Sequence, residues 1–134
     1  MDHLLGTPYI YGGNNPLEGM DCSGAVLEVL KAVGIWKNGD TTSQGLYDHF
    51  AKSGRDMTSA AKMPNVLRAP DILFFGESKT EISHVALYYG FQLMWESGGG
   101  GSSTKTLEDA KKAGAFVRLR PMDLRGDLVA ILRP

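Results

Sequence analysis

The apolar residues that follow Cys22 recur at helical spacing. They stand three or four positions apart and end before Gly34; the series is Ala25, Val26, Val29, Leu30 and Val33. The preceding residues, 9–16, are rich in turn-forming types, which favours a loop. The pattern therefore predicts a helix that begins at or near Cys22 and stops at Gly34.

A second helix is predicted between Thr41 and Gly54. Thr41 and Gln44 have the spacing of a capping box, and Gly54 lies where a glycine commonly ends a helix. The apolar face of this helix consists of Leu46, Tyr47, Phe50 and Ala51. From residue 55 to residue 69 the pattern is weak, and only Ala60-Ala61 suggests a helical turn.

The second half of the chain carries short apolar and alternating runs that are typical of strands. The expected strands are Asp71–Phe75, Ser83–Tyr89, Leu93–Ser97, Phe116–Arg120 and Asp127–Leu132. Residues 97–104 form a glycine–serine loop, and Thr106, with Asp109 three residues later, is expected to cap a short helix that ends at Ala113. Helices followed by mostly antiparallel strands with short connections predict an α+β fold.

Composition and charge narrow the class of protein. The 134 residues fit one domain over residues 1–134, and a net charge of −1 with scattered basic residues argues against a nucleic-acid surface. No apolar run approaches the roughly 20 residues that span a bilayer, so no membrane insertion is expected. The N-terminus lacks the pattern of a signal peptide. A substrate outside the cytoplasm would then require another export route or a longer parent protein, and the localisation stays open.

Cys22 is the only cysteine, which excludes an internal disulfide and a multi-cysteine zinc site. It stands in Asp21-Cys22-Ser23-Gly24, at the predicted start of the first helix. The free N–H groups and the dipole of a helix N-terminus favour an anion, and a thiolate is one. Cys22 is therefore a candidate nucleophile; the alternative is a small buried apolar residue.

A cysteine nucleophile needs a general base, normally a histidine. Of the three histidines, His3 lies near the terminus, His49 lies beside the apolar face of the second helix, and His84 begins a strongly patterned strand. A rigid strand is a good mount for a base, so His84 is the candidate, although a structural histidine is the alternative. The three histidines lack metal-ligand spacing, so neither a metal nor another cofactor is implied.

Several motifs occur together and in order along the chain. They are Gly6-Thr7-Pro8-Tyr9-Ile10-Tyr11-Gly12-Gly13, Asp21-Cys22-Ser23-Gly24, Pro70-Asp71-Ile72-Leu73-Phe74-Phe75 and His84-Val85-Ala86-Leu87-Tyr88-Tyr89-Gly90. From about Gly6 to Ser97, the chain resembles the NlpC/P60 family of papain-like cell-wall peptidases. The resemblance implies a papain-like fold in which the helix with the nucleophile packs on a mostly antiparallel sheet of about five to six strands.

The resemblance also implies roles for single residues. Cys22 would be the nucleophile, His84 its base, and Glu96 the third residue, where the family usually has His, Asn or Gln. A carboxylate can orient and stabilise an imidazolium, but Glu96 could also be a solvated strand residue. The role requires His84 and Glu96 on one face of the hairpin, which a regular two-residue Gly90-Phe91 turn forbids and an odd-length loop or a bulge allows.

Further site residues follow from the same resemblance. Tyr11 would line the site and could donate to an oxyanion beside the Cys22 backbone N–H, whereas its alternative is simple packing. Asp21 and Ser23 would help to bind a polar stem peptide, and Asp21 could also cap the helix. Trp36 and Trp95 are assigned to the core.

The expected function is a cysteine endopeptidase that hydrolyses peptidoglycan stem peptides, with the D-γ-glutamyl bond to the diamino acid as the expected bond. The alternatives are a papain-like N-acetylmuramoyl-alanine amidase, an acyltransferase, or a non-catalytic peptidoglycan-binding module. The missing signal peptide favours a phage tail-associated or lytic enzyme, in a larger assembly, over a secreted effector.

Overall fold

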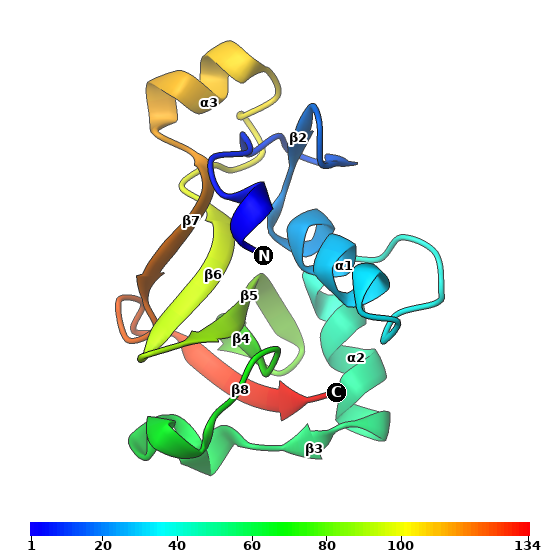
Figure 1. Cartoon of the computed structure of the whole chain (residues 1–134), viewed down its shortest axis with the longest axis vertical. Coiled ribbons are helices and arrows are strands. Elements are labelled where there is room, and N and C mark those ends of the chain that lie inside the picture. Colours follow the sequence, from blue (N-terminus) through cyan, green and yellow to red (C-terminus); the bar gives the residue numbers. More distant parts are fainter.

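A curled antiparallel sheet organises the molecule, and two helices cover one of its faces (Figure 1). The computed structural model describes residues 1–134, apart from the side chain of Pro64. Its sheet has six strands in the order β3-β8-β4-β5-β6-β7. These are β3 (Arg55–Asp56), β4 (Ile72–Ser78), β5 (Glu81–Gly90), β6 (Leu93–Gly98), β7 (Phe116–Pro121) and β8 (Leu128–Arg133). The predicted α+β fold with a mostly antiparallel sheet is confirmed.

The helices lie close to their expected positions. The α-helices are α1 (Cys22–Ala32), α2 (Ser43–Ser53) and α3 (Leu107–Ala113), and the 3-10 turns are η1 (Asp2–Leu4), η2 (Thr58–Lys62) and η3 (Pro64–Val66). A small hairpin, β1 (Asn14–Asn15) with β2 (Gly19–Met20), precedes α1. The Thr106–Asp109 capping box of α3 is present in both directions. None of the described helices is long and apolar enough to cross a bilayer.

The start of α2 differs from the prediction. Thr42, not Thr41, is the N-cap residue, and its hydroxyl accepts from the Gly45 N–H at 3.0 Å. Gln44 is therefore one residue too close to the cap to complete a capping box. Its side chain instead accepts from the Ile82 N–H at 2.7 Å and donates to the Lys79 carbonyl at 2.8 Å. The predicted capping box is wrong because Gln44 joins α2 to the turn between β4 and β5.

Residues of the central strands are buried on both faces of the sheet, which explains their nearly continuous apolar runs. In β4, Phe74 packs in the cluster beneath α1 and α2, whereas Leu73 and Phe75 pack in a second cluster with residues of the η2 segment. Trp36 and Trp95 are 6% and 0% exposed, so their assignment to the core is confirmed.

The hairpin of β5 and β6 contains a register shift, which the expected role of Glu96 beside His84 requires. Phe91 and Gln92 form the turn with positive φ angles, and the register shifts between Tyr88 and Gly90. Beyond this bulge, Leu87 pairs with Trp95. Continued along the strands, that register brings position 96 opposite position 86, on the same face as His84. Of the two expected solutions, an odd-length loop or a bulge, the hairpin has the bulge.

Candidate active site

Asp21 fixes the first turn of α1. One carboxylate oxygen, Oδ1, accepts from the Gly24 N–H at 2.8 Å and from the Ser23 hydroxyl at 3.2 Å. The other, Oδ2, accepts from the Gly12 N–H at 3.1 Å, which ties the preceding loop to the helix. Cys22 is thus the first residue of α1, and its N–H has no acceptor within the helix.

The loop lies directly against this first turn. A side chain on Gly24 would collide with the carbonyl oxygen of Gly13, so the close approach requires a glycine at this helical position. Asp21 and Gly24 together hold the loop and the cysteine in one arrangement.

His84 and Glu96 meet inside the protein, where they are 7% and 3% exposed. Nε2 of His84 lies 2.8 Å from Oε1 of Glu96. The second carboxylate oxygen, Oε2, accepts from Nε of Arg118 at 3.1 Å, because Arg118 is the strand partner of Glu96 on β7. Both oxygens of Glu96 are therefore engaged, in a series that runs from Arg118 to His84.

The neighbouring charges shift the pKa values of His84 and Glu96 in opposite directions. Burial lowers the pKa of His84, but hydrogen bonding and charge from Cys22 and Glu96 outweigh burial and raise it from 6.5 to about 9. Burial raises the pKa of Glu96, but His84 and Arg118 outweigh burial and lower it. These pKa shifts favour a protonated His84 and an ionised Glu96 near neutral pH.

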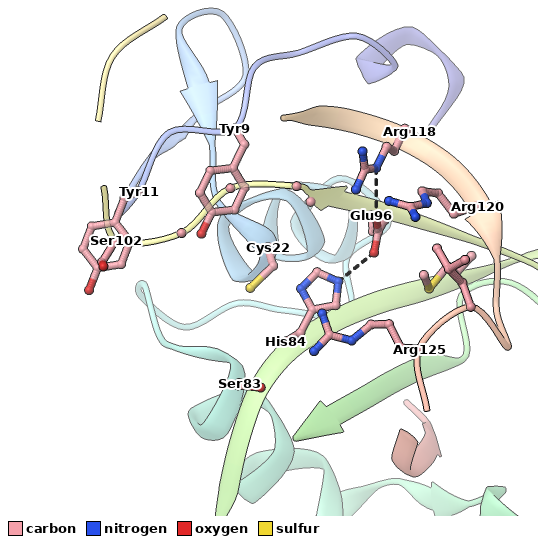
Figure 2. Close-up of a pocket in the computed structure, with 16 residues that line it drawn as sticks. Tyr9, Tyr11, Cys22, Ser83, His84, Glu96, Ser102, Arg118, Arg120 and Arg125 are labelled. Atoms are coloured by element: carbon pink, nitrogen blue, oxygen red, sulfur yellow. Dashed lines mark hydrogen bonds and ion pairs between the residues drawn. The ribbon is translucent and has the colours of Figure 1, made fainter. Parts of the chain in front are cut away.

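A groove runs past these groups. The Cys22 side chain lies beside the His84 ring, and His84 points toward Glu96 (Figure 2). A cavity of about 630 Å³ lies on the His84 side of Cys22, and a second of about 440 Å³ lies on the α1 side. The two share Tyr9, Tyr11, Cys22 and Ser83, so Cys22 stands where they join.

Comparison with known proteins identifies the protein family. The sequence profile of the NlpC/P60 family matches residues 6–120. The chain belongs to the NlpC/P60 family.

Individual relatives agree with this assignment. The chain is 35% identical over 106 residues to the gamma-D-glutamyl-L-lysine dipeptidyl-peptidase of Bacillus subtilis (strain 168), covering 78% of this chain and 32% of that protein. It is 31% identical over 114 residues to peptidoglycan endopeptidase RipA of Mycolicibacterium smegmatis, covering 75% of this chain and 20% of that protein. The chain therefore spans a third or less of the length of these curated relatives.

A solved structure shows the shared fold. The NlpC/p60 domain of the peptidoglycan hydrolase SagA superposes with a TM-score of 0.69 at 22% identity, over 99% of this chain and 92% of that chain.

The residues expected from the NlpC/P60 resemblance all lie on the groove, but at different depths. Cys22, His84 and Glu96 converge. Asp21 and Ser23 line the α1 side, where Ser23 is buried and already bonded to Asp21. Tyr11 lines both cavities but is 54% exposed, at the outer rim.

Several groove residues could not be inferred from the motifs. Tyr9 lines both cavities, and its hydroxyl points toward Cys22 (Figure 2). Burial, followed by the charges of Cys22 and Asp21, raises the pKa of Tyr9 to about 12. The larger cavity also contains Arg118, Arg120 and Arg125. The spacing of Arg118 and Arg120 predicts a shared strand face, but not that this face meets Glu96.

Metal-ligating residues do not gather at the groove. Within the part of the chain that the structure describes, no three His, Cys, Asp or Glu side chains are grouped so as to hold a metal ion.

Proposed function

We propose that this chain is a cysteine peptidase that hydrolyses peptidoglycan stem peptides. The observation that carries the proposal is the buried 2.8 Å contact of His84 with Glu96, beside a cysteine at a helix start, in one groove. Cys22 is the proposed nucleophile, His84 the acid and base, and Glu96 the residue that positions the imidazole. Family membership supports this assignment, since one relative is named a peptidoglycan endopeptidase and another a gamma-D-glutamyl-L-lysine dipeptidyl-peptidase.

The chemistry follows from the placement of the two ring nitrogens. Nε2 of His84 is held by Glu96, so Nδ1 is the nitrogen that serves Cys22 and the substrate. The thiolate attacks the amide carbonyl carbon, and a carbon–sulfur bond forms. Nδ1 then gives its proton to the leaving amine as the carbon–nitrogen bond breaks. A water molecule, deprotonated by His84, attacks the acyl-enzyme and releases the acid and the thiolate.

Two donors are available for the oxyanion of each tetrahedral intermediate. The Cys22 N–H is free at the start of α1. Tyr9 is the proposed second donor in place of Tyr11, because its hydroxyl is directed toward Cys22 and its pKa of about 12 keeps the proton on the oxygen. Tyr11 is left as a rim residue.

The bond that we propose is the D-γ-glutamyl amide to the diamino acid. Its support is the name of the 35% identical relative, a gamma-D-glutamyl-L-lysine dipeptidyl-peptidase. Asp21 and Ser23, on the α1 side of the groove, are proposed to contact the polar peptide on its acyl side, including a free amine where one is present.

The test is mass spectrometry of defined peptidoglycan fragments incubated with the protein and with Cys22→Ala in parallel. Cys22-dependent cleavage at the γ-glutamyl bond is the expected result. Loss at the sugar–alanine bond would identify an amidase, and transfer of the acyl group to an added amine would identify an acyltransferase. A folded protein that cleaves none of the fragments, with an inert thiol, would be a binding module.

A phage tail-associated setting is the hypothesis for the biological context. The position of the gene tests it: a place among tail genes would support the hypothesis, and a place among cell-wall or secretion genes would reject it.

A further inference from the structure

The cavity on the His84 side contains three guanidinium groups, and only one of them lacks a partner. Arg118 is bonded to Glu96. Arg125 is held by Asp127 through two contacts, Nε to Oδ1 at 2.9 Å and Nη2 to Oδ2 at 2.8 Å. Arg120 makes no hydrogen bond or ion pair with any residue that the structure describes.

Arg120 lines the cavity and is partly buried. It lies on β7, two residues from Arg118 and opposite Met94 of β6, so both arginines occupy one face of the sheet. Figure 2 shows the guanidinium groups of Arg118, Arg120 and Arg125 around the His84–Glu96 pair. A guanidinium presents a rigid fork of donors that fits a carboxylate, and a partly desolvated one without a partner favours an anionic ligand.

The opposite end of the groove has the opposite charge. The α1 side is lined by Asp21 and Asp40 together with neutral polar residues, and no arginine or lysine is among the lining residues described there. Asp40 is paired with Lys31, Nζ to Oδ1 at 3.4 Å, and accepts from the Asn14 amide at 2.6 Å. This charge difference favours a peptide whose anionic part lies at Arg120 and whose cationic part lies toward Asp21.

The position of His84 shows which part of the substrate meets Arg120. His84 must reach the leaving amine, and it lines only the larger cavity. The residue that departs with that amine is consequently the one beside Arg120.

We infer that Arg120 binds a free carboxylate of the leaving residue, and this inference rests on the proposed peptidase function. A diamino acid whose side chain ends in both an amine and a carboxylate, such as meso-diaminopimelate, supplies such a group on its side chain, whereas lysine supplies only an amine. Arg120 thus selects stem peptides by the charge of the leaving residue.

Binding to a Cys22→Ala protein tests the inference without turnover. Calorimetric titration compares L-Ala-γ-D-Glu-meso-diaminopimelate with forms in which one or the other carboxylate of the diamino acid is converted to a carboxamide. The acid is expected to bind about tenfold more tightly than the form whose side-chain carboxylate is converted, and about as tightly as the form whose main-chain carboxylate is converted. Adding Arg120→Gln should remove this preference, and adding Arg68→Gln, an exposed arginine outside the groove, should retain it.

Equal binding of the acid and the side-chain carboxamide would overturn the inference, as would an Arg120→Gln loss that is the same for all three peptides. The latter result would mean that Arg120 acts on Glu96 instead of on the substrate.

Hydrolysis by the wild-type protein separates the two proposals. If the protein cleaves the peptides but binds the acid and the amide equally, the peptidase proposal is supported and the Arg120 subsite is rejected. If the protein prefers the acid but cleaves none of the peptides, the anion site is supported and the peptidase proposal is rejected.

Discussion

The two halves of the groove are built in different ways. On the α1 side, the bonds that hold Asp21 join residues 3 and 9 positions apart. On the sheet side, His84 and Glu96 are 12 positions apart, and Glu96 and Arg118 are 22 apart. The α1 half is thus held by short-range bonds within residues 12–24, whereas the sheet half is an electrostatic network that exists only after three strands have paired.

Because of this difference, we expect mutations in the two halves to affect different properties of the protein. Polar groups of the sheet half are almost fully enclosed and set the protonation of His84, so their loss should alter chemistry. Polar groups of the α1 half cap a helix and attach a loop, so their loss should first alter stability.

The largest expected effect is on the sheet side, at His84. His84→Ala removes the proposed acid and base, and hydrolysis should fall by about 10³-fold or more. Steady-state cleavage of a stem peptide measures it, with circular dichroism as the check on folding. His49→Ala is the control, because His49 packs on Trp36 and Phe50, away from the groove. A His84→Ala protein with more than a tenth of the wild-type rate would contradict the role of His84 as acid and base.

Glu96→Gln should reduce the rate constant of hydrolysis by about 10- to 100-fold and shift its pH dependence. His84 binds its proton more tightly in the folded protein than its ordinary pKa of 6.5 implies, so the protonated form is present at low pH and is lost as the pH rises through about 9. Activity that needs this proton therefore declines above about pH 9.

Removing the Glu96 carboxylate removes one cause of the raised His84 pKa, so the alkaline decline should move to lower pH. The pH profile of kcat/KM measures this shift. An unchanged alkaline limb in Glu96→Gln would show that Glu96 does not act on His84.

On the α1 side, Gly24→Ala should lower stability by about 1–3 kcal/mol, because the new methyl group collides with the Gly13 carbonyl. The sign is informative, since Gly→Ala inside a helix ordinarily stabilises by up to about 1 kcal/mol. Urea unfolding measures it, with Gly39→Ala as the control, since a side chain there meets nothing. An unfolding free energy equal to or above that of the wild type would rule out the packed loop.

The smallest expected effect is at the helix cap. Asp21→Ala should lower the free energy of unfolding by about 1 kcal/mol, and Asp21→Asn by less, because the amide oxygen still accepts from the Gly24 N–H. A raised KM in a stably folded Asp21→Asn protein would add a substrate contact to the capping role. Equal stability of Asp21→Ala and the wild type would contradict the cap.

The elements with a local signal could be predicted from the sequence. The helix after Cys22, the capping box of Thr106 with Asp109, and the odd-length loop or bulge needed between His84 and Glu96 follow from spacing or from strand geometry, and all three are present. At α2, the cap is Thr42 instead of the predicted Thr41, and the side chain of Gln44 bonds to a distant turn, which local spacing does not show.

The rest of the site depends on strand pairing that spacing cannot give. Arg118 reaches Glu96 only because β7 lies beside β6 in this register, and the same pairing brings Arg120 into the cavity. Arg125 enters from the segment between β7 and β8. Tyr9 and Tyr11 both belong to the recognised motif, and only the folded loop shows which of them turns toward Cys22.

The proposed pair of Cys22 as nucleophile and His84 as its acid and base is tested most directly at the thiol. Because Cys22 is the only cysteine, the rate of alkylation by iodoacetamide at pH 6 reports on this thiol alone. The wild-type thiol should react at least about tenfold faster than the thiol of a folded His84→Ala protein. Equal rates in the two proteins would contradict the Cys22–His84 pair and, with it, the proposed peptidase.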